Sequence, residues 1–493
     1  MFPFRFDWNE EGFENEFAFY KRHTIDERLK RSNKGKNKQG CFDFKNWKSS
    51  KFNLKKALEK HENPIYNEYA YFYDYARDAI YNLDEKDTIS CDYTREGLSD
   101  DAKFIIHIKG KEKKDEPDEY ELDIKQVSLK AFATGVAILS IQLENNKYPD
   151  FKDILKINDF GRRIYPQYIK NINTEETKKS FLADKIIIEG LEDKKIIENF
   201  EFQPNSDIVI GSHILTLLGA SFTQNKHETE KYYIQPILDD RMFVISWYGN
   251  ETFSKNLINS KYITDDDWYK YVFVDGEDKT VFSNHMQTKL IQNATYDRWM
   301  NSPYGLTIYG VSRYSFVCLA SSDFPKIHVH TMYFQMVLLA LATRASIIRF
   351  SDEIAAIANK KDIDKLEKLY ELYLTFYNRL YFKEVTHQDQ GIELYEMIRK
   401  QMRIDEHIEK LDNKFTKLFE FADLQATKKH DDLLQLISGV FIFPSLMIAL
   451  LSMGIFDYQK SWISLIAGLI AVLLSGIIGY KAFDRVIKRV KDA

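Results

Sequence analysis

The chain has 493 residues and a net charge of -5; 29% of the residues are charged and 14% are aromatic. A chain of this length and apolar content can bury a large core in two or three domains, which excludes a disordered protein. Its near balance of acidic and basic side chains offers no general attraction to nucleic acids, so no direct nucleic-acid binding is expected. The three cysteines are widely spaced without a CxxC pattern, which argues against a zinc site and a disulfide framework.

The first 325 residues predict a mixed α and β domain. Apolar residues at helical spacing from Tyr69 to Ile80 predict one helix, and another is expected over Asp153 to Gly161. Alternating or continuous apolar runs predict strands at residues 102–108, 120–127, 135–143, 231–238, 241–248, 270–276 and 306–319. No Gly-rich phosphate loop, HExxH or GxSxG motif accompanies them, so the chain is not expected to be an enzyme.

Two short polar stretches in this domain carry candidate ligand-binding residues. Arg162 and Arg163 follow the predicted helix, and Asp239, Asp240 and Arg241 precede a predicted strand. Adjacent arginines suit a phosphate through forked hydrogen bonds, and carboxylates accept hydrogen bonds from ribose hydroxyls or amino groups. The same arginines and aspartates could instead pair with one another, and the sequence leaves that alternative open.

Helical patterns follow over residues 330–358 and 362–384, and a longer one over 388–432. The uncharged stretch 331–343 is too short to span a bilayer and predicts a buried helix. The longest pattern predicts a single stalk helix with a heptad seam, which favours assembly with other helices. The seam consists of Met397, Ile404, Ile408, Leu411, Phe415, Leu418 and Ala422.

Two uncharged runs near the end, Leu433 to Phe456 and Ser461 to Tyr480, predict a pair of membrane spans. Each is long enough to cross the hydrocarbon layer of about 30 Å at about 1.5 Å per helical residue. Lysines precede the first run, and five basic residues follow Tyr480, whereas the loop between the runs has one acid and one base. By the positive-inside rule, both chain ends are expected on the cytoplasmic side.

Polar residues recur every seven positions through the first span, at Asp431, Ser438, Ser445 and Ser452. They fall on one stripe of a helix, and a polar stripe favours a water-filled axis between subunits over lipid. Stacked serine rings beside a carboxylate ring would concentrate cations, and Pro444 predicts a kink in mid-span. Two alternatives stay open, namely that the serines only pack helices together and that the spans only anchor the protein.

This arrangement resembles the CorA superfamily of divalent cation channels, and the resemblance covers Ser321 to Ala493. The run GVFIFPSLMIALLSMGIF resembles that family's pore helix, with its proline and with Gly454 near the outer end. The resemblance implies a homo-oligomer, taken here as a pentamer, a divalent cation as the permeant ion and no required cofactor. The family's Gly-Met-Asn signature is absent, because residues 452–456 read Ser-Met-Gly-Ile-Phe, and this argues against magnesium selectivity.

The stretches NDFGRRIYPQY, DDRMFV and YGLTIYGVSRYSFVCL resemble the CorA-like membrane effectors found with type III CRISPR systems. In that group the cytosolic part senses a nucleotide second messenger, an S-adenosylmethionine–AMP conjugate. The resemblance implies that Arg162, Arg163 and Asp240 lie in a ligand site, with Asp239, Arg241 and Arg313 as neighbours. It assigns no metal ligands.

Together these patterns predict an α+β cytosolic ligand-sensing domain (1–325), a helical stalk (326–432) and a two-helix transmembrane hairpin with a basic tail (433–493). The expected function is a cation channel of the cell inner membrane, opened by the nucleotide messenger to disrupt the ion balance of infected cells. The alternative is a constitutive CorA-like transporter of divalent metal ions such as magnesium, cobalt or nickel. A tethered binding protein without a pore is the third class.

Overall fold

A computed structural model describes most of the first 424 residues and isolated positions beyond them. The described residues are 1–8, 42, 44–50, 52, 68–81, 89–108, 119–164, 182–192, 194–200, 210–225, 227–259, 262, 265–276, 280–303, 305–360, 363–424, 427, 431, 434, 470 and 481. Backbone contacts divide the chain into two compact units, Met1–Leu411 and Asp412–Ala493. We call the first unit the body. The predicted domain boundaries at residues 325 and 432 stay predictions.

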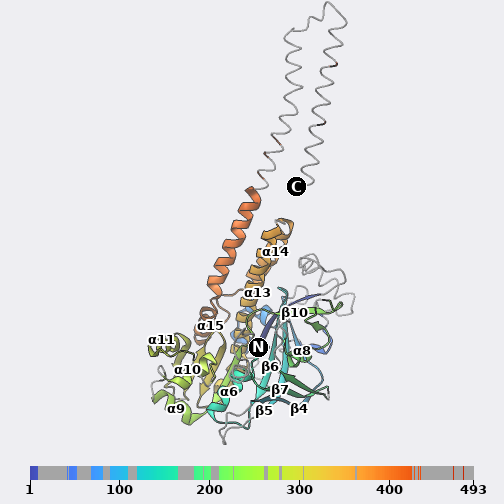
Figure 1. The fold of residues 1–493 in the computed structure, drawn as a ribbon. Helices are drawn as coiled ribbons and strands as arrows, with labels where there is room; N and C mark the ends of the chain where they lie inside the picture. Colours follow the sequence, from blue (N-terminus) through green and yellow to red (C-terminus); the bar gives the residue numbers. More distant parts are fainter. Residues whose placement is uncertain are drawn as a thin grey trace, which may run out of the picture. The chain divides into compact units, whose positions relative to one another are not determined.

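The body has an α+β fold built on a ten-stranded sheet, whose order along the main path is β8-β7-β4-β5-β6-β1-β10-β9 (Figure 1). Its pairings are antiparallel except for β9 with β10, and β3 pairs with both β2 and β5. The strands are β1 (Phe2–Trp8), β2 (Trp47–Ser50), β3 (Ser90–Arg95), β4 (Leu98–His107), β5 (Glu119–Phe132), β6 (Val136–Glu144), β7 (Lys185–Leu191), β8 (Lys194–Asn199), β9 (Phe222–Thr223) and β10 (Tyr232–Pro236).

Strand β5 holds this sheet together because its two halves have different partners. Its first residues pair with β4, its last residues pair with β3, and β6 pairs with it from Asp123 to Ala131. The β5–β6 hairpin turns at Gly135, whose φ of 75° lies in the left-handed region that glycine adopts without steric cost. The Gly135 carbonyl accepts a hydrogen bond from the backbone N–H of Phe6 in β1. The turn therefore aligns β1 with the hairpin.

A second, four-stranded sheet has the order β11-β14-β13-β12. Its strands are β11 (Val244–Gly249), β12 (Thr295–Trp299), β13 (Thr307–Val311) and β14 (Ser315–Ala320). Helix α10 (Asp266–Phe273) packs directly on β13, where a methyl group on Gly310 would come within 2.4 Å of a Val272 methyl carbon. This close approach needs a glycine at position 310, since real contacts of a Cβ atom are longer.

The other helices surround the two sheets (Figure 1). They are α5 (Asp74–Tyr81), α6 (Phe151–Phe160), α8 (Ser212–Leu218), α9 (Glu251–Asn259), α11 (Asn284–Ala294), α12 (Phe324–His330), α13 (Met332–Lys360), α14 (Ile363–Arg379) and α15 (Asp389–Gln401). Helix α13 contacts β1 and β6 of the large sheet, and also α12, α14 and α15. It is therefore the central helix of the body.

Within the described part of the chain, one helical stretch, Phe324–Ala358, is long and apolar enough to cross a membrane. It includes α12 and most of α13, and 78% of its most apolar window is buried inside the protein. That burial is typical of a core helix. It agrees with the sequence prediction of a buried helix over residues 331–343.

The predicted single stalk helix over residues 388–432 is wrong at one point. Helix α15 ends at Gln401, and Arg403 has a φ of 54°, in the left-handed region that breaks a helix. A second helical stretch runs from residue 404 to residue 424. Of the predicted seam, three residues are buried within the body, which weakens the case that this part of the seam joins subunits; these are Ile404, Ile408 and Leu411.

Two further sequence predictions need correction. Residues 270–276 were predicted as a strand, but most of them belong to α10. Cys91 is disulfide-bonded, whereas the cysteine spacing argued against a disulfide framework, and Cys318 is a buried free thiol.

The predicted transmembrane hairpin lies outside the described residues, apart from the helical positions Leu434 and Ile470.

Candidate functional site

The fold brings the two polar stretches from the sequence into direct contact. Arg163 and Arg241 form an antiparallel β-bridge. The backbone N–H of Met242 donates to the Arg162 carbonyl at 2.7 Å, and the N–H of Ile164 donates to the Asp240 carbonyl at 3.1 Å. The segment after α6 and the segment before β11 are thereby fixed side by side, as the proposed ligand site requires.

The arginines and aspartates of the two stretches pair with one another within the chain, which is the alternative that the sequence left open. The Arg163 guanidinium donates to the Asp240 carboxylate at 2.9 Å, and both side chains are buried. Arg241 lies 3.3 Å from the other oxygen of Asp240 and 3.6 Å from Asp239. Asp239 accepts a hydrogen bond from the backbone N–H of Asp240. Arg163, Asp240 and Arg241 therefore form a connected network without a ligand.

Arg162 is less completely paired than Arg163. Its Nη2 group donates to Asp159 at 3.0 Å and to the carbonyl of Val274 at 2.6 Å. The residue is only 4% exposed, and its Nε and Nη1 groups have no hydrogen-bond partner among the described residues. Unmade hydrogen bonds of a buried cation carry a large desolvation cost, so such donors favour an incoming acceptor.

The carbonyl that holds Arg162 comes from a strained residue. Val274 ends α10 with φ 51° and ψ 52°, a left-handed conformation that is unusual for a β-branched side chain. Strain of this kind persists only where the surrounding structure enforces it, and it often accompanies binding sites. Val274, and Asp159 on α6, are site residues that the sequence analysis missed.

Burial controls the protonation of the site. It raises the pKa of Asp240 to about 6, a hydrogen bond with Asp239 adds to the shift, and Arg163 opposes it. Burial also lowers the pKa of Arg162 and of Arg163. Removing these charges from water costs free energy that their mutual pairing only partly returns. An anion that binds here would recover part of that cost.

Arg313, the remaining predicted ligand-site residue, lies at the tip of the β13–β14 hairpin and is exposed. Its neighbour Tyr314 packs its ring against the Arg241 guanidinium, with 5.4 Å from the guanidinium carbon to the ring centroid. Arg313 and Tyr314 at the hairpin tip also act electrostatically on Arg344 of α13: burial lowers the pKa of Arg344, the charge of Arg313 lowers it further, and Tyr314 opposes the shift. Arg344 was not a predicted site residue, although it interrupts an otherwise apolar helix in the sequence.

We refer to the five arginines of this region as the arginine cluster. They come from the α6 exit, the β11 entry, the β13–β14 turn and α13, and the carboxylates near them are Asp159, Asp239 and Asp240. Cations therefore outnumber anions, so the region favours an anionic ligand. The cluster consists of Arg162, Arg163, Arg241, Arg313 and Arg344.

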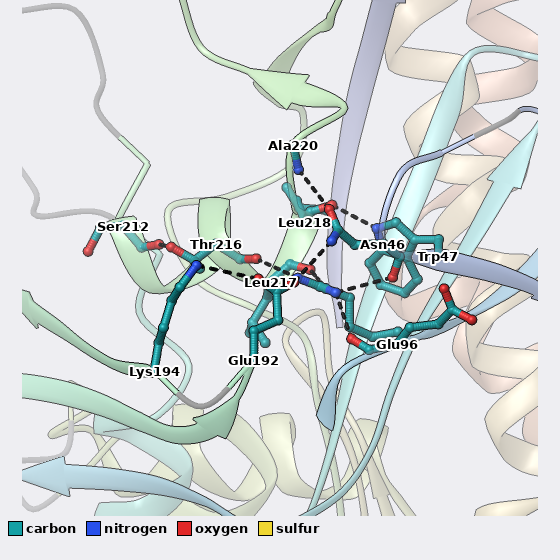
Figure 2. Close-up of polar contacts among 11 residues, drawn as sticks. Asn46, Trp47, Glu96, Glu192, Lys194, Ser212, Thr216, Leu217, Leu218 and Ala220 are labelled. Atoms are coloured by element: carbon teal, nitrogen blue, oxygen red, sulfur yellow. Dashed lines mark hydrogen bonds and ion pairs between the residues drawn. The ribbon is translucent and has the colours of Figure 1, made fainter. Parts of the chain in front are cut away.

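Arg95, a buried arginine elsewhere in the body, shows how a structural arginine is satisfied. Figure 2 labels the residues that accept its hydrogen bonds, namely Asn46, Glu96, Glu192, Thr216 and Leu217. Arg95, which is 5% exposed, donates to the carbonyls of Leu217 at 2.8 Å and Glu96 at 2.7 Å and to the Glu192 carboxylate at 2.9 Å. Longer bonds to the carbonyls of Asn46 and Thr216 complete its donor set. Arg399, a buried arginine outside this region, leaves one donor, Nε, without a partner, whereas Arg162 leaves two.

The predicted pore residues fall mainly outside the described part of the chain. Asp431 is helical and exposed. Ser438, Pro444, Ser445, Ser452 and Gly454 lie outside the described residues. Among the residues that the structure describes, no group of three or more His, Cys, Asp or Glu side chains could hold a metal ion.

His213, on α8, gives the body a pH-dependent stability that can be measured. Burial lowers its pKa to about 4, and the adjacent Arg163 backbone opposes the shift only in part. The unfolded chain takes up this proton near pH 6.5 and the folded chain only near pH 4, so stability falls as the pH drops through that window. We expect a loss of about 2 kcal/mol at pH 5 from this group.

Thermal unfolding of the wild type and of His213→Leu at pH 7 and pH 5 checks this expectation. The leucine variant should lose less stability on acidification, by the amount that His213 contributes. The matched control is His227→Gln, which alters an exposed histidine and should follow the wild type. An equal acid response in the wild type and His213→Leu would contradict the assignment.

No family model, no curated protein and no solved structure matches this chain.

Proposed function

We propose that the protein is a ligand-gated cation channel of the cell inner membrane, in which the body binds a phosphate-bearing nucleotide. The observation that carries the proposal is the arginine cluster, with the unpaired donors of the buried Arg162. The two uncharged runs at residues 433–456 and 461–480, with the polar stripe of the first, support the membrane part. The channel is proposed to be a homo-oligomer.

The chemistry of the cluster suits a nucleotide better than a simple anion. A phosphate accepts forked hydrogen bonds from guanidinium groups. Asp239 is half-buried, so its carboxylate is available to accept hydrogen bonds from a ribose hydroxyl or an amino group of the same ligand. The mixture of cations and carboxylates therefore matches a ligand that has both a phosphate and hydrogen-bond donors.

The resemblance to CorA-like effectors of type III CRISPR systems supports an S-adenosylmethionine–AMP conjugate as the activating ligand. Opening would let ions flow down their gradients and would arrest an infected cell. To shift a closed channel towards the open state a hundredfold, the ligand must bind the open state about 3 kcal/mol more tightly. Two charge-assisted hydrogen bonds that form only in the open state are enough for this difference.

Ion flux through liposomes that contain the purified full-length protein tests the proposal. We expect flux to rise at least tenfold when the conjugate is added and to stay at the background level with adenosine. Ser445→Leu should abolish the flux while leaving ligand binding unchanged, because it replaces a proposed pore residue far along the chain from the cluster.

The other function classes predict different outcomes. A constitutive divalent-metal transporter would conduct without the conjugate and would close as the metal concentration rises. A tethered binding protein would bind the conjugate but show no flux in either the wild type or Ser445→Leu. Either result would overturn the channel proposal.

A further inference from the structure

We propose that the buried Arg344, whose Nε group has no hydrogen-bond partner among the described residues, forms with Arg313 and His407 a second anion subsite that takes a phosphate group. It deepens the ligand site proposed above and rests on that site, but not on the channel activity. Arg344 lies on α13, Arg313 on the β13–β14 turn and His407 on the helical stretch that begins at residue 404. The subsite therefore joins three elements that are distant in the sequence.

The argument begins with the burial of Arg344. It is only 7% exposed, and its Nε group is buried without a hydrogen-bond partner. No carboxylate lies within ion-pair distance of it among the described residues. By contrast, Arg349, five residues later on the same helix, pairs with both Asp7 and Glu353 at 2.8 Å. A buried guanidinium without a carboxylate is costly, so the site is built for a partner that the chain does not supply.

The electrostatic surroundings of Arg344 indicate that the missing partner is negatively charged. Burial lowers the pKa of Arg344 to about 10, the positive charge of Arg313 lowers it further, and Tyr314 and Asp239 oppose these effects. An anion between the buried Arg344 and the exposed Arg313 would stabilise both positive charges. This is the arrangement expected of a phosphate subsite.

His407 adds a third nitrogen-bearing side chain from another element. Burial lowers its pKa, Arg344, Lys410 and Arg313 lower it further, and Glu406 opposes them. Burial first, and then the surrounding positive charges, therefore favour the neutral form of this imidazole. A neutral imidazole can still donate one hydrogen bond to a phosphate oxygen.

Asp239 connects this subsite with the rest of the arginine cluster. It is within electrostatic reach of both Arg344 and Arg162. A ligand with two phosphate-type groups, or one phosphate and one other anionic group, can thus occupy both sides of Asp239. The fork of Arg344 favours phosphate, because Nε and Nη2 together match two oxygens of one tetrahedral group.

Calorimetric titration of the full-length protein with inorganic pyrophosphate, at fixed pH and ionic strength, tests the subsite. We expect Arg344→Gln to weaken binding at least tenfold and Arg313→Gln to weaken it several-fold. The matched control is Arg379→Gln. Arg379 ends α14 and pairs with Asp78 of α5 at 2.7 Å, so its replacement should leave the affinity for pyrophosphate unchanged. Arg313 is exposed, so its variant carries the test even if Arg344→Gln fails to fold.

Three results would overturn the subsite. The first is an absence of pyrophosphate binding by the wild type, and the second is equal affinity in the wild type, Arg344→Gln and Arg313→Gln. The third is an equal loss in Arg379→Gln, which would show a general charge effect. If a carboxylate from another copy filled the site instead, Arg344→Gln would alter the oligomer mass and leave pyrophosphate affinity unchanged. Flux measurements are not needed, so failure of the subsite and failure of the channel proposal are separable.

Discussion

Arg349→Met is expected to destabilise the body by about 3–5 kcal/mol, because it removes one partner of a buried ionic network. Arg349 donates to Asp7 of β1, to Glu353 one helical turn away and to the Gly135 carbonyl at the β5–β6 turn. Its side chain is 3% exposed. Without it, Glu353 keeps its burial but loses its cation, and α13 loses its polar attachment to the large sheet.

The same substitution at Arg344 is not expected to destabilise the body. Arg344→Met removes a buried cation that has no carboxylate partner among the described residues, and it fills the same space with apolar atoms. Such replacements are neutral or stabilise by up to about 2 kcal/mol. Because arginine and methionine have nearly equal helix propensities, the pair of variants isolates the effect of ionic partners.

Thermal unfolding of the two full-length variants at pH 7, without ligand, measures both effects. We expect Arg349→Met to melt below the wild type and Arg344→Met to melt at or above it. Two melting temperatures that fall together would mean that Arg344 has a stabilising partner, and the proposed subsite would lose its basis. The comparison also tests whether Arg344 lowers the stability of the folded protein in the absence of ligand, as residues of functional sites often do.

Arg162→Met is expected to weaken binding of the S-adenosylmethionine–AMP conjugate at least a hundredfold. Each charge-assisted hydrogen bond contributes about 1.5–3 kcal/mol, and Arg162 has two unpaired donors, Nε and Nη1, for the ligand. A loss of about 3 kcal/mol corresponds to roughly a hundredfold in affinity. Calorimetric titration of the full-length protein with the conjugate measures the change.

A second variant keeps this prediction independent of folding. Arg162→Met also leaves Asp159 without its cation, so its fold must be checked by melting temperature. Arg162→Lys retains a positive charge for Asp159 but loses the fork, and we expect about a tenfold loss of affinity with little change in stability. Arg298→Met serves as the control, because Arg298 is half-exposed and pairs with Glu393. Unchanged affinity in Arg162→Lys and Arg162→Met would remove Arg162 from the ligand site.

The sequence predicted about half of the described strands, namely those with a clear local signal, and it missed β1, β2, β3, β7, β8, β9 and β12. Alternating apolar residues identified β4, β5, β6, β10 and the β13–β14 hairpin. Residues 270–276 were misread because a short aromatic run suits either a strand or a buried helix. The helix signal was just upstream, where the Asp265 carboxylate accepts a hydrogen bond from the Trp268 N–H and two more aspartates occupy the first turn.

The candidate site could be predicted only in part for a related reason. Adjacent arginines and aspartates are visible in a sequence, but whether they pair with one another depends on tertiary packing. The backbone bridge between Arg163 and Arg241 decides this, and no local pattern predicts it. Arg344 was visible only as a charge in an apolar helix. Its electrostatic relation to Arg313 depends on tertiary packing, in which Tyr333 of α13 contacts Tyr309 and Phe316 of the second sheet. The break at Arg403 was likewise hidden, since an arginine in a helical pattern gives no sign of a left-handed conformation.

The position of β1 within the large sheet has a consequence for synthesis on the ribosome. This strand of residues 2–8 lies between β6 and β10, and its register partners include Val136–Leu139 and Tyr232–Pro236. At translation rates of about 5–20 residues per second, roughly 10 to 50 s pass between synthesis of β1 and synthesis of its second neighbour. Both hydrogen-bonding edges of β1 are unprotected until β6 is made, and the edge that pairs with β10 stays unprotected for the whole interval, so nascent chains are expected to need a chaperone until β10 emerges.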